Sequence, residues 1–206
     1  MAITAIPIQP VQDVSGNQWR AFRIIEENAQ TFKAGTVVAV AGADGGIIAW
    51  GGATVSGAVG SPVGISYEAA SNLATTGKGA PLPNQPVVGI GAAVGTFGSV
   101  PNEPSAVNIA HGAPFNDGRV GLFSASPDTY YSAVLGNAGN PATPTNALLS
   151  TNPLAGLTLD TGANFWYVDL SKTNLVQIIG LDPRDTPAAG SRVIFRFIQT
   201  AVQQLG

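Results

Sequence analysis

Apolar residues in the first third of the chain gather into short runs that glycine-rich turns separate. Residues 36–40 and 47–50 are rich in β-branched side chains and flank Asp44-Gly45-Gly46, where glycine reaches positive φ at little cost. This arrangement predicts two strands that pair antiparallel through a tight turn. Residues 62–67 form another such run after a loop of small residues, and they predict a third strand.

Alternation of apolar and polar positions is clearest in the C-terminal half. Val193, Phe195 and Phe197 fall on one face of residues 193–198, whereas the other face mixes arginine with isoleucine. A period of two residues is typical of a strand with one core face. Five similar runs bounded by Pro, Gly, Asn or Asp predict further strands: residues 119–123, 130–135, 156–159, 165–170 and 176–179.

The middle of the chain is less regular. Residues 19–32 hold the one cluster of charges and fit a strand or a short helix; we interpret them as a strand that enters the barrel. Long loops are predicted near residues 71–86 and 95–118, on either side of a strand of small residues at 87–94. Loops of this length inside one domain are expected to be functional or ordered by a partner.

The first 18 residues have a different pattern. Pro7 and Pro10 interrupt their apolar positions, which excludes a helix and a central strand. A disordered tail, a leading edge strand and a partner-binding arm all remain open. We favour the arm, whose removal should leave the stability of the fold nearly unchanged. The predicted organisation is therefore an extended N-terminal arm, residues 1–18, and a β-barrel domain, residues 19–206. The side chains expected to fill pockets of the partner are Ile3, Ile6, Ile8 and Val11.

Composition adds an expectation about association. Hydrophobic residues make up 45% of the chain, but Asp, Glu, Lys and Arg only 10%, against roughly 25% in ordinary globular proteins. With 26 Gly and 15 Pro, the chain fits an all-β protein whose surface is unusually apolar or covered by partners. We expect a symmetric homo-oligomer whose contacts involve Ile65 and Ile90, on strands where small residues permit close approach.

Charge, cysteine content and the amino-terminal sequence restrict the classes of function. The net charge is −3 and the nine basic residues are scattered, so direct binding of nucleic acid is not expected. Without cysteine the chain has neither disulfides nor thiolate metal sites. No basic and apolar leader is visible, and no apolar run approaches the roughly 18 residues of a membrane span. We expect a soluble protein made in the cytoplasm, without contact with a membrane.

Motifs that imitate enzyme signatures have simpler explanations. Asp160-Thr161-Gly162 resembles the catalytic loop of aspartic proteases, but that chemistry needs two aspartates and the chain holds one copy. We predict a turn in which Asp160 binds backbone amides and Gly162 has positive φ. The glycines of residues 89–95 imitate a dinucleotide motif without a following helix, and His111 is the sole histidine. We therefore expect no catalytic activity, no cofactor and no metal.

Residues 32–70 carry a family resemblance. Their order is a strand, the Asp44-Gly45-Gly46 turn, a strand ending in Ala49-Trp50, a glycine-rich loop and a Val-Gly-Ile strand. This order resembles the head-decoration proteins of lambdoid tailed phages, whose small barrel is called a β-tulip. Residues 71–206 then require additional antiparallel strands, in a second barrel or a jelly-roll-like extension. Residues 156–193 also resemble C-terminal segments of uncharacterised phage structural proteins.

The resemblance implies a function in the virion. It suggests a trimeric decoration or cement protein that binds the major capsid protein on the outside of the phage head and stabilises contacts between capsid subunits. The implied location is the capsid surface, after synthesis in the host cytoplasm. Two alternatives remain open, namely a tail or neck protein of the virion and a carbohydrate-binding or adhesive module. For the adhesive module a stacking platform would consist of Trp50, Tyr130, Tyr131, Trp166 and Tyr167.

Overall fold

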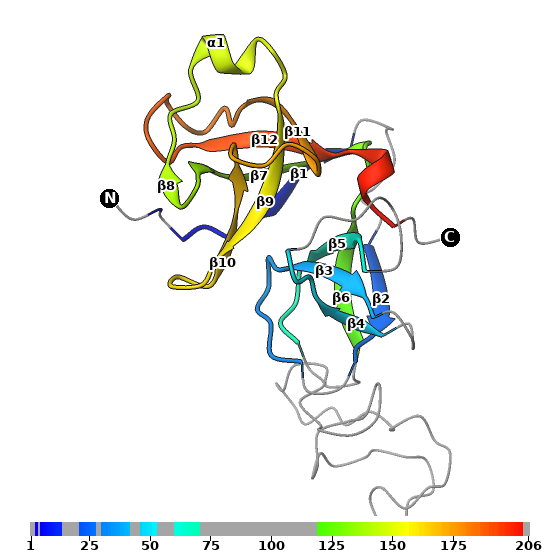
Figure 1. The fold of residues 1–206 in the computed structure, drawn as a ribbon. Coiled ribbons are helices and arrows are strands. Elements are labelled where there is room, and N and C mark those ends of the chain that lie inside the picture. The colour runs from blue at the N-terminus through cyan, green and yellow to red at the C-terminus, as the bar shows by residue number, and fades with distance from the viewer. Residues whose placement is uncertain are drawn as a thin grey trace, which may run out of the picture.

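The predicted all-β class is confirmed. A computed structural model describes residues 3, 5–13, 21–27, 30–41, 46–52, 60–70 and 119–203 (Figure 1). In this part of the chain, two β-sheets make up the fold, and helical structure is confined to one short α-helix, α1 (Asn146–Leu149), and one 3-10 turn, η1 (Gln199–Ala201). The two sheets occupy separate parts of the molecule, one above the other in Figure 1.

The first sheet forms what we call the N-terminal ring. Its strands are β2 (Ala21–Ile25), β3 (Val37–Val40), β4 (Ile47–Ala49), β5 (Pro62–Ser66) and β6 (Arg119–Ser124). They lie in the order β2-β6-β5-β3-β4 with antiparallel neighbours, and β3 and β4 pair as predicted. Directly after β2, an isolated parallel bridge joins Glu26 to Ile47 at the start of β4. The amide of Glu27 also donates to the Ile47 carbonyl at 2.9 Å. The last strand of the order, β4, therefore meets the chain directly after the first strand, β2.

The second sheet forms the C-terminal ring. Its strands are β7 (Thr129–Asn137), β9 (Leu154–Asp160), β10 (Phe165–Asp169), β11 (Val176–Leu181) and β12 (Arg192–Phe197). The short strand β8 (Asn140–Pro141) forms a hairpin with β7. Because β7 pairs antiparallel with β12 and parallel with β10, the order β7-β10-β9-β11-β12 also closes on itself. Each of the six strands predicted from the C-terminal half coincides with one of the strands β6, β7, β9, β10, β11 and β12.

Both rings have the same connectivity. When the five strands of each ring are numbered along the chain, the first pairs with the fifth, the fifth with the fourth, the fourth with the second and the second with the third. In both rings the third strand, or its first residue, returns parallel to the end of the first. The C-terminal strands are therefore a second ring rather than a jelly-roll-like extension. The described part of the chain thus contains one five-stranded unit twice.

The rings share a continuous apolar core. Val38 lies inside the N-terminal ring, packed with apolar residues of β4, β5 and β6. Its neighbours Val37 and Ala39 point to the other face of β3 and belong to the cluster that contains Tyr131 and Phe195 of the C-terminal ring. Since β3 is buried on both faces, its sequence is a continuous apolar run without alternation.

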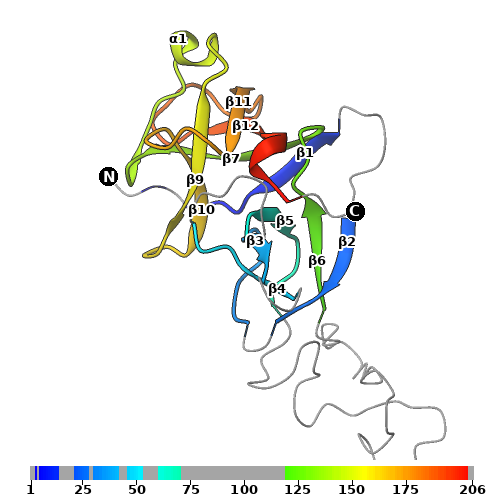
Figure 2. The ribbon, with the colours of Figure 1, turned by 45° about the vertical axis from the view of Figure 1, so that its right-hand side comes forward.

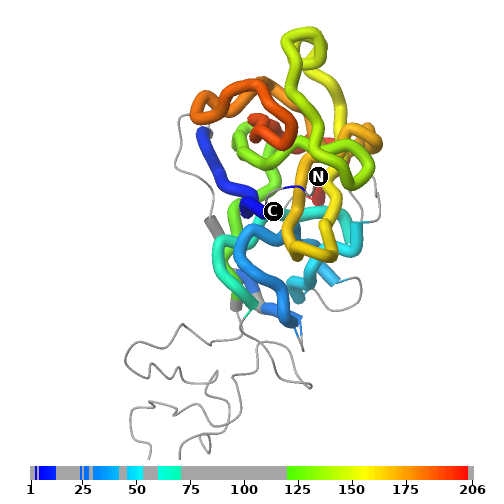
Figure 3. Tube along the Cα trace, turned by 90° about the vertical axis from the view of Figure 1, so that its left-hand side faces the viewer, coloured from blue at the N-terminus to red at the C-terminus, as the bar shows by residue number. Residues whose placement is uncertain are grey.

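The two chain ends cross between the rings (Figures 2 and 3). Strand β1 (Gln9–Asp13) precedes the N-terminal ring in sequence but pairs antiparallel with the first half of β7 in the C-terminal ring. In the opposite direction, Gln203 follows the C-terminal ring, and its amide donates to the Pro62 carbonyl of β5 at 3.0 Å. Each ring is thus bound by the terminal segment that belongs in sequence to the other.

The N-terminal residues are a leading edge strand rather than a free arm. Ile3 is 4% exposed and packs with Val134, Phe165 and Tyr167, whereas Ile8 is 3% exposed and belongs to the core shared by the rings. Val11 is half-buried within β1, whose register shifts between Pro10 and Gln12. Ile6 is also half-buried, against the cluster around Ile3. The prediction that these residues are removable without loss of stability therefore disagrees with their burial.

Candidate functional site

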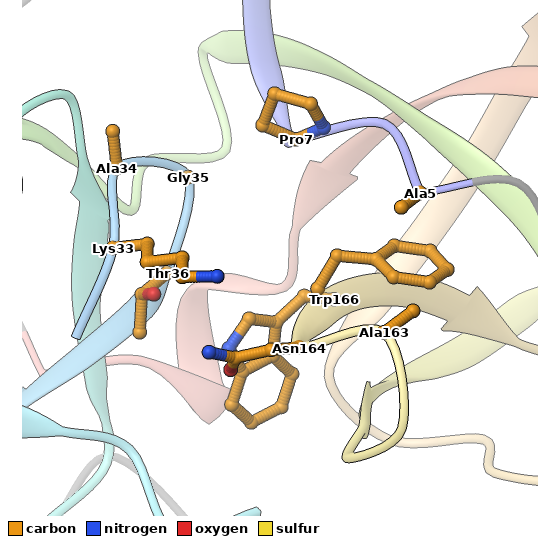
Figure 4. A pocket seen from close by; sticks show the side chains of 10 residues that line it. Ala5, Pro7, Lys33, Ala34, Gly35, Thr36, Ala163, Asn164 and Trp166 are labelled. Atoms are coloured by element: carbon orange, nitrogen blue, oxygen red, sulfur yellow. The ribbon is translucent and has the colours of Figure 1, made fainter.

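A concave surface in the described residues follows the boundary between the rings, which we call the seam. Two adjoining hollows of about 220 Å³ each lie along it. The N-terminal ring contributes residues 30–36, which precede β3, and the C-terminal ring contributes residues 163–166, at the β9–β10 turn. Ala5 and Pro7 of the N-terminal segment line one side of the first hollow (Figure 4). Ala49 and Trp50 line the second hollow, so four separate parts of the chain build the seam.

The first hollow has polar groups on opposite sides. Figure 4 shows Lys33 and Thr36 from the N-terminal ring facing Asn164 and Trp166 from the C-terminal ring. Lys33 is the one charged side chain of this lining. It is exposed and forms no ion pair within the described ranges. The hollow thus presents an ammonium group, an amide and a hydroxyl beside an aromatic wall.

Close packing with the N-terminal segment fixes the backbone next to Lys33. Gly35 has a φ of +82°, and a Cβ at this residue would lie 2.6 Å from the Cβ of Pro7. Both facts require glycine here, because a side chain would be strained and would collide with Pro7. The Gly35 amide donates to the Ser66 carbonyl at 2.7 Å, which ties this turn to β5. The turn at Gly35 is therefore shaped by its contact with Pro7 and Ile8.

The opposite side of the hollow is set by the turn around Asp160. As predicted, its carboxylate accepts hydrogen bonds from the amides of Gly162 and Ala163, at 2.9 and 3.0 Å. The prediction of positive φ at Gly162 is wrong, because Asn164 is the residue with positive φ, 54°. The Asp160 carboxylate holds the residues up to Ala163 at negative φ. The left-handed conformation then falls on Asn164, a residue type that tolerates it.

The second hollow has an apolar base formed by Phe32, Trp50 and Leu159, and no charged side chain lines it. Trp50 and Trp166 stack across the seam with ring centroids 5.3 Å apart and planes inclined by 24°. They are 6% and 2% exposed, and both indole Nε1 atoms are buried without a hydrogen-bond partner in the described residues. Thr36, Asn164 and Trp166 line both hollows, so the two adjoin.

The aromatic platform considered for an adhesive module is not on the surface. Trp50, Tyr131, Trp166 and Tyr167 are all buried. Tyr131 packs among Phe195 and Phe197 and donates its hydroxyl hydrogen to the Ser124 carbonyl at 2.6 Å. Tyr130 alone of the five is half-buried. These aromatic side chains pack in the core and at the seam, so they do not form an open surface on which sugars could stack.

A cluster of paired charges lies away from the seam, between β11 and β12. Asp182 is fully buried and accepts hydrogen bonds from the guanidinium of Arg184, at 2.9 and 2.6 Å, and from the Ser132 hydroxyl of β7. Bonds from Arg184 lower the pKa of Asp182 far below its ordinary value, although burial opposes them. Arg192 of β12 binds Asp185 through two nitrogens at 3.1 and 2.5 Å. This cluster holds the connection against the ring.

A second buried carboxylate, Asp169, ends β10. It accepts hydrogen bonds from the Ala138 amide, from the amide and hydroxyl of Ser171, and from the Thr158 hydroxyl, at 2.7–3.0 Å. Burial raises the pKa of Asp169, but these bonds outweigh it and the pKa lies below its ordinary value. Burial, followed by the Asp169 charge, raises the pKa of Tyr167. The bonds to Asp169 join the β7–β8 turn, strand β9 and the segment that follows β10.

Several residues chosen from the sequence do not lie at the seam surface. Ile65 is fully buried in the core of this chain, so its side chain does not face another copy. Ile90, His111, the glycines of residues 89–95, the loops near 71–86 and 95–118 and the strand at 87–94 lie outside the described residues. In the described part of the chain, no group of three or more His, Cys, Asp or Glu side chains is placed to hold a metal. No helix among these residues is long and apolar enough to cross a membrane.

Sequence reasoning missed the seam itself. Lys33, Thr36 and Asn164 carry no motif, and they meet because the two rings pack together. Comparisons with protein-family models, with curated proteins and with solved structures find no match to this chain.

Proposed function

We propose that this protein is a structural component of a tailed-phage virion: a decoration or cement protein that binds the outside of the head and stabilises contacts between major capsid subunits. The observation that carries the proposal is the form taken by the segment with the family resemblance. Residues 37–66 supply β4, β3 and β5, three neighbouring strands of a small five-stranded ring. A compact barrel of this kind agrees with what the resemblance implies.

Surface chemistry supports a protein that works in an assembly. The chain has 12 acidic and 9 basic residues among 206, so large parts of its surface lack charge. Surfaces of this kind are typical of proteins that bind partners. Burial of Ile3 and Ile8 moves the proposed contact away from the N-terminal side chains. The seam, with its hollows and its lone lysine, takes their place as the proposed contact surface.

The test is attachment to phage heads. Purified protein is mixed with expanded shells assembled from the major capsid protein encoded in the same genome, and the shells are pelleted. We expect saturable co-sedimentation and added density on the outer surface in electron micrographs. Absence of binding to shells would contradict the proposal, and binding to purified tails instead would assign the protein to the tail or neck.

Oligomeric state is a separate part of the proposal. On the family analogy we propose a trimer, with contacts that do not involve the buried side chain of Ile65. Sedimentation equilibrium of the isolated protein and of the protein on shells measures this directly. A monomer in both states would contradict the trimer while leaving attachment to the head unaffected.

A further inference from the structure

We infer that the seam binds an extended segment of a partner protein, which places an acidic side chain beside Lys33 and an apolar side chain, two residues away, against Trp50. The inference rests on the proposed attachment to a protein partner, and it names the part of that partner which the seam recognises. The residues that form this site lie within 5–7, 30–36, 49–50 and 159–166, all in the described part of the chain.

The first hollow has the chemistry of a carboxylate site. Lys33 is its single charge and points across the hollow toward Asn164 (Figure 4). The ammonium, the Asn164 amide and the Thr36 hydroxyl can all donate hydrogen bonds, and a carboxylate can accept several of them at once. Charge-assisted bonds of this type are stronger than those between neutral groups. A negative group is therefore the best occupant of this hollow.

The second hollow has the chemistry of an apolar site. Phe32, Trp50 and Leu159 form its base, and its polar lining, Gln30 and Thr31 with the shared Thr36 and Asn164, is uncharged. It adjoins the first hollow through Thr36, Asn164 and Trp166. In an extended chain, side chains two residues apart lie on the same side, about 7 Å from one another. Adjacent hollows of different polarity thus fit alternate side chains of one extended segment.

The floor of the seam also has hydrogen-bonding capacity that the described residues leave unused. The indole Nε1 groups of Trp50 and Trp166 are buried donors without an acceptor in this part of the chain. Buried donors without partners are unfavourable, so a change that supplies acceptors is favoured. A peptide carries one carbonyl per residue. A slight separation of the two stacked indole groups would let an inserted segment provide these acceptors.

The test is a titration followed by NMR of the isotope-labelled full-length protein. The probe is the capped pentapeptide acetyl-Ala-Asp-Ala-Leu-Ala-amide, with Asn in place of Asp, and Ser in place of Leu, as matched probes. We expect saturable shifts of the Asn164 side-chain amide and of the Trp50 and Trp166 indole signals with the first peptide. Each matched probe should bind about fivefold more weakly, as should Lys33→Gln protein with the first peptide.

The control variant is Lys172→Gln, which removes an exposed lysine that packs against Gly156 and lines neither hollow, and it should leave the affinity unchanged. Equal binding of the Asp and Asn peptides, or equal binding to the Lys33→Gln and wild-type proteins, would overturn the inference. So would the same shifts with acetate alone, or no saturable shift up to about 10 mM peptide. Failure here with intact binding to shells refutes the seam as the contact and leaves the decoration function standing.

Discussion

The two rings have the same connectivity but differ in the strand pairing that closes each of them. Strands of the N-terminal ring are three to six residues long, and a single bridge between Glu26 and Ile47 closes the order. In the C-terminal ring β7 alone spans nine residues, and a parallel ladder, with Val168 opposite Leu135 and Asp169 opposite Gly136, closes it. Strand order therefore does not determine how firmly a ring is closed.

Core composition follows the same difference. Aliphatic side chains fill most of the N-terminal ring, around Val38 and Leu122. In the C-terminal ring, the aromatic side chains of Tyr131, Phe195 and Phe197 pack against one another. Aromatic side chains bury more area and add specific ring contacts. The C-terminal ring also has the saturated carboxylates Asp169 and Asp182. We therefore regard it as the scaffold against which the N-terminal ring is held.

The largest expected effect comes from removing an aromatic side chain of this scaffold. Phe195→Ala should lower the free energy of unfolding by about 4 kcal/mol, because it leaves a cavity between Tyr131 and Phe197. Leu122→Ala, the matched change in the N-terminal ring, should cost about 3 kcal/mol and affect mainly amides of β3 and β5. Urea unfolding and amide hydrogen exchange measure the two effects. Equal loss of protection in both rings for Leu122→Ala would contradict the difference between them.

The next effect concerns the buried Asp182. Asp182→Asn removes the charge that Arg184 and Ser132 bind and should cost about 2–3 kcal/mol at neutral pH, less than for a fully buried pair because the Arg184 side chain is half-exposed. Because the pKa of Asp182 is lower in the folded than in the unfolded protein, its stabilisation is present above about pH 4 and is lost as the pH falls further. Urea unfolding between about pH 6 and pH 2 should therefore show a smaller loss of stability for the variant than for the wild type.

A matched control for this prediction is Asp128→Asn, which changes an exposed carboxylate on the short link between the rings. Its unfolding free energy should stay within about 0.5 kcal/mol of the wild type. If Asp182→Asn loses stability in acid as steeply as the wild type does, the buried carboxylate is not the source of the pH dependence.

The third effect tests the crossing of the N-terminal segment to the C-terminal ring. Ile8→Ala should cost about 2–3 kcal/mol, since Ile8 is buried in the shared core. Gln9→Ala, at an exposed neighbour, should have little effect. Thermal unfolding measures both variants. Unchanged stability of Ile8→Ala would restore the interpretation of residues 1–18 as a dispensable arm.

The smallest effect measures how far the rings are coupled at the seam. Trp50→Phe and Trp166→Phe keep an aromatic side chain at each position but reduce the area of the stacked contact. A double-mutant cycle should give a coupling free energy of about 1 kcal/mol. Urea unfolding of the two single variants and the double variant supplies the three values. Strict additivity would mean that the two rings contact each other at the seam without energetic coupling.

Local pattern predicted the strands well, because β-branched runs bounded by Gly, Pro and Asn carry their own signal. The hairpin of β3 and β4, and the core face of Val193, Phe195 and Phe197, are both as expected. A leading edge strand was only one of three open alternatives for residues 1–18, and the sequence named no partner for it. Nothing near residues 9–13 indicates a partner strand at residues 129–132, and Pro10 is tolerated because β1 lies at a sheet edge.

The site was harder to predict than the fold. Asp160 could be assigned to a turn, since its side chain binds amides only two and three residues away. The position of Lys33 opposite Asn164 depends on how two rings pack, which no spacing in the sequence records. Burial likewise decided the role of Ile65: an apolar residue on a strand of small side chains suits an interface as well as a core, and Ile65 of β5 belongs to the core that the rings share.

The pairing of β1 with β7 also has a consequence during synthesis. Gln9 lies opposite Ser132, and Ile3 packs against Phe165 and Tyr167. The first residues to be synthesised can therefore form these contacts only after much later residues have been synthesised. At 5–20 residues per second, the ribosome needs on the order of 10 s to cover that distance. The N-terminal ring has all its strands by Ser124, while Ile3 and Ile8 still lack their contacts. Nascent chains arrested before Thr129 should therefore present these two isoleucines to chaperones, and chains released after Phe197 should not.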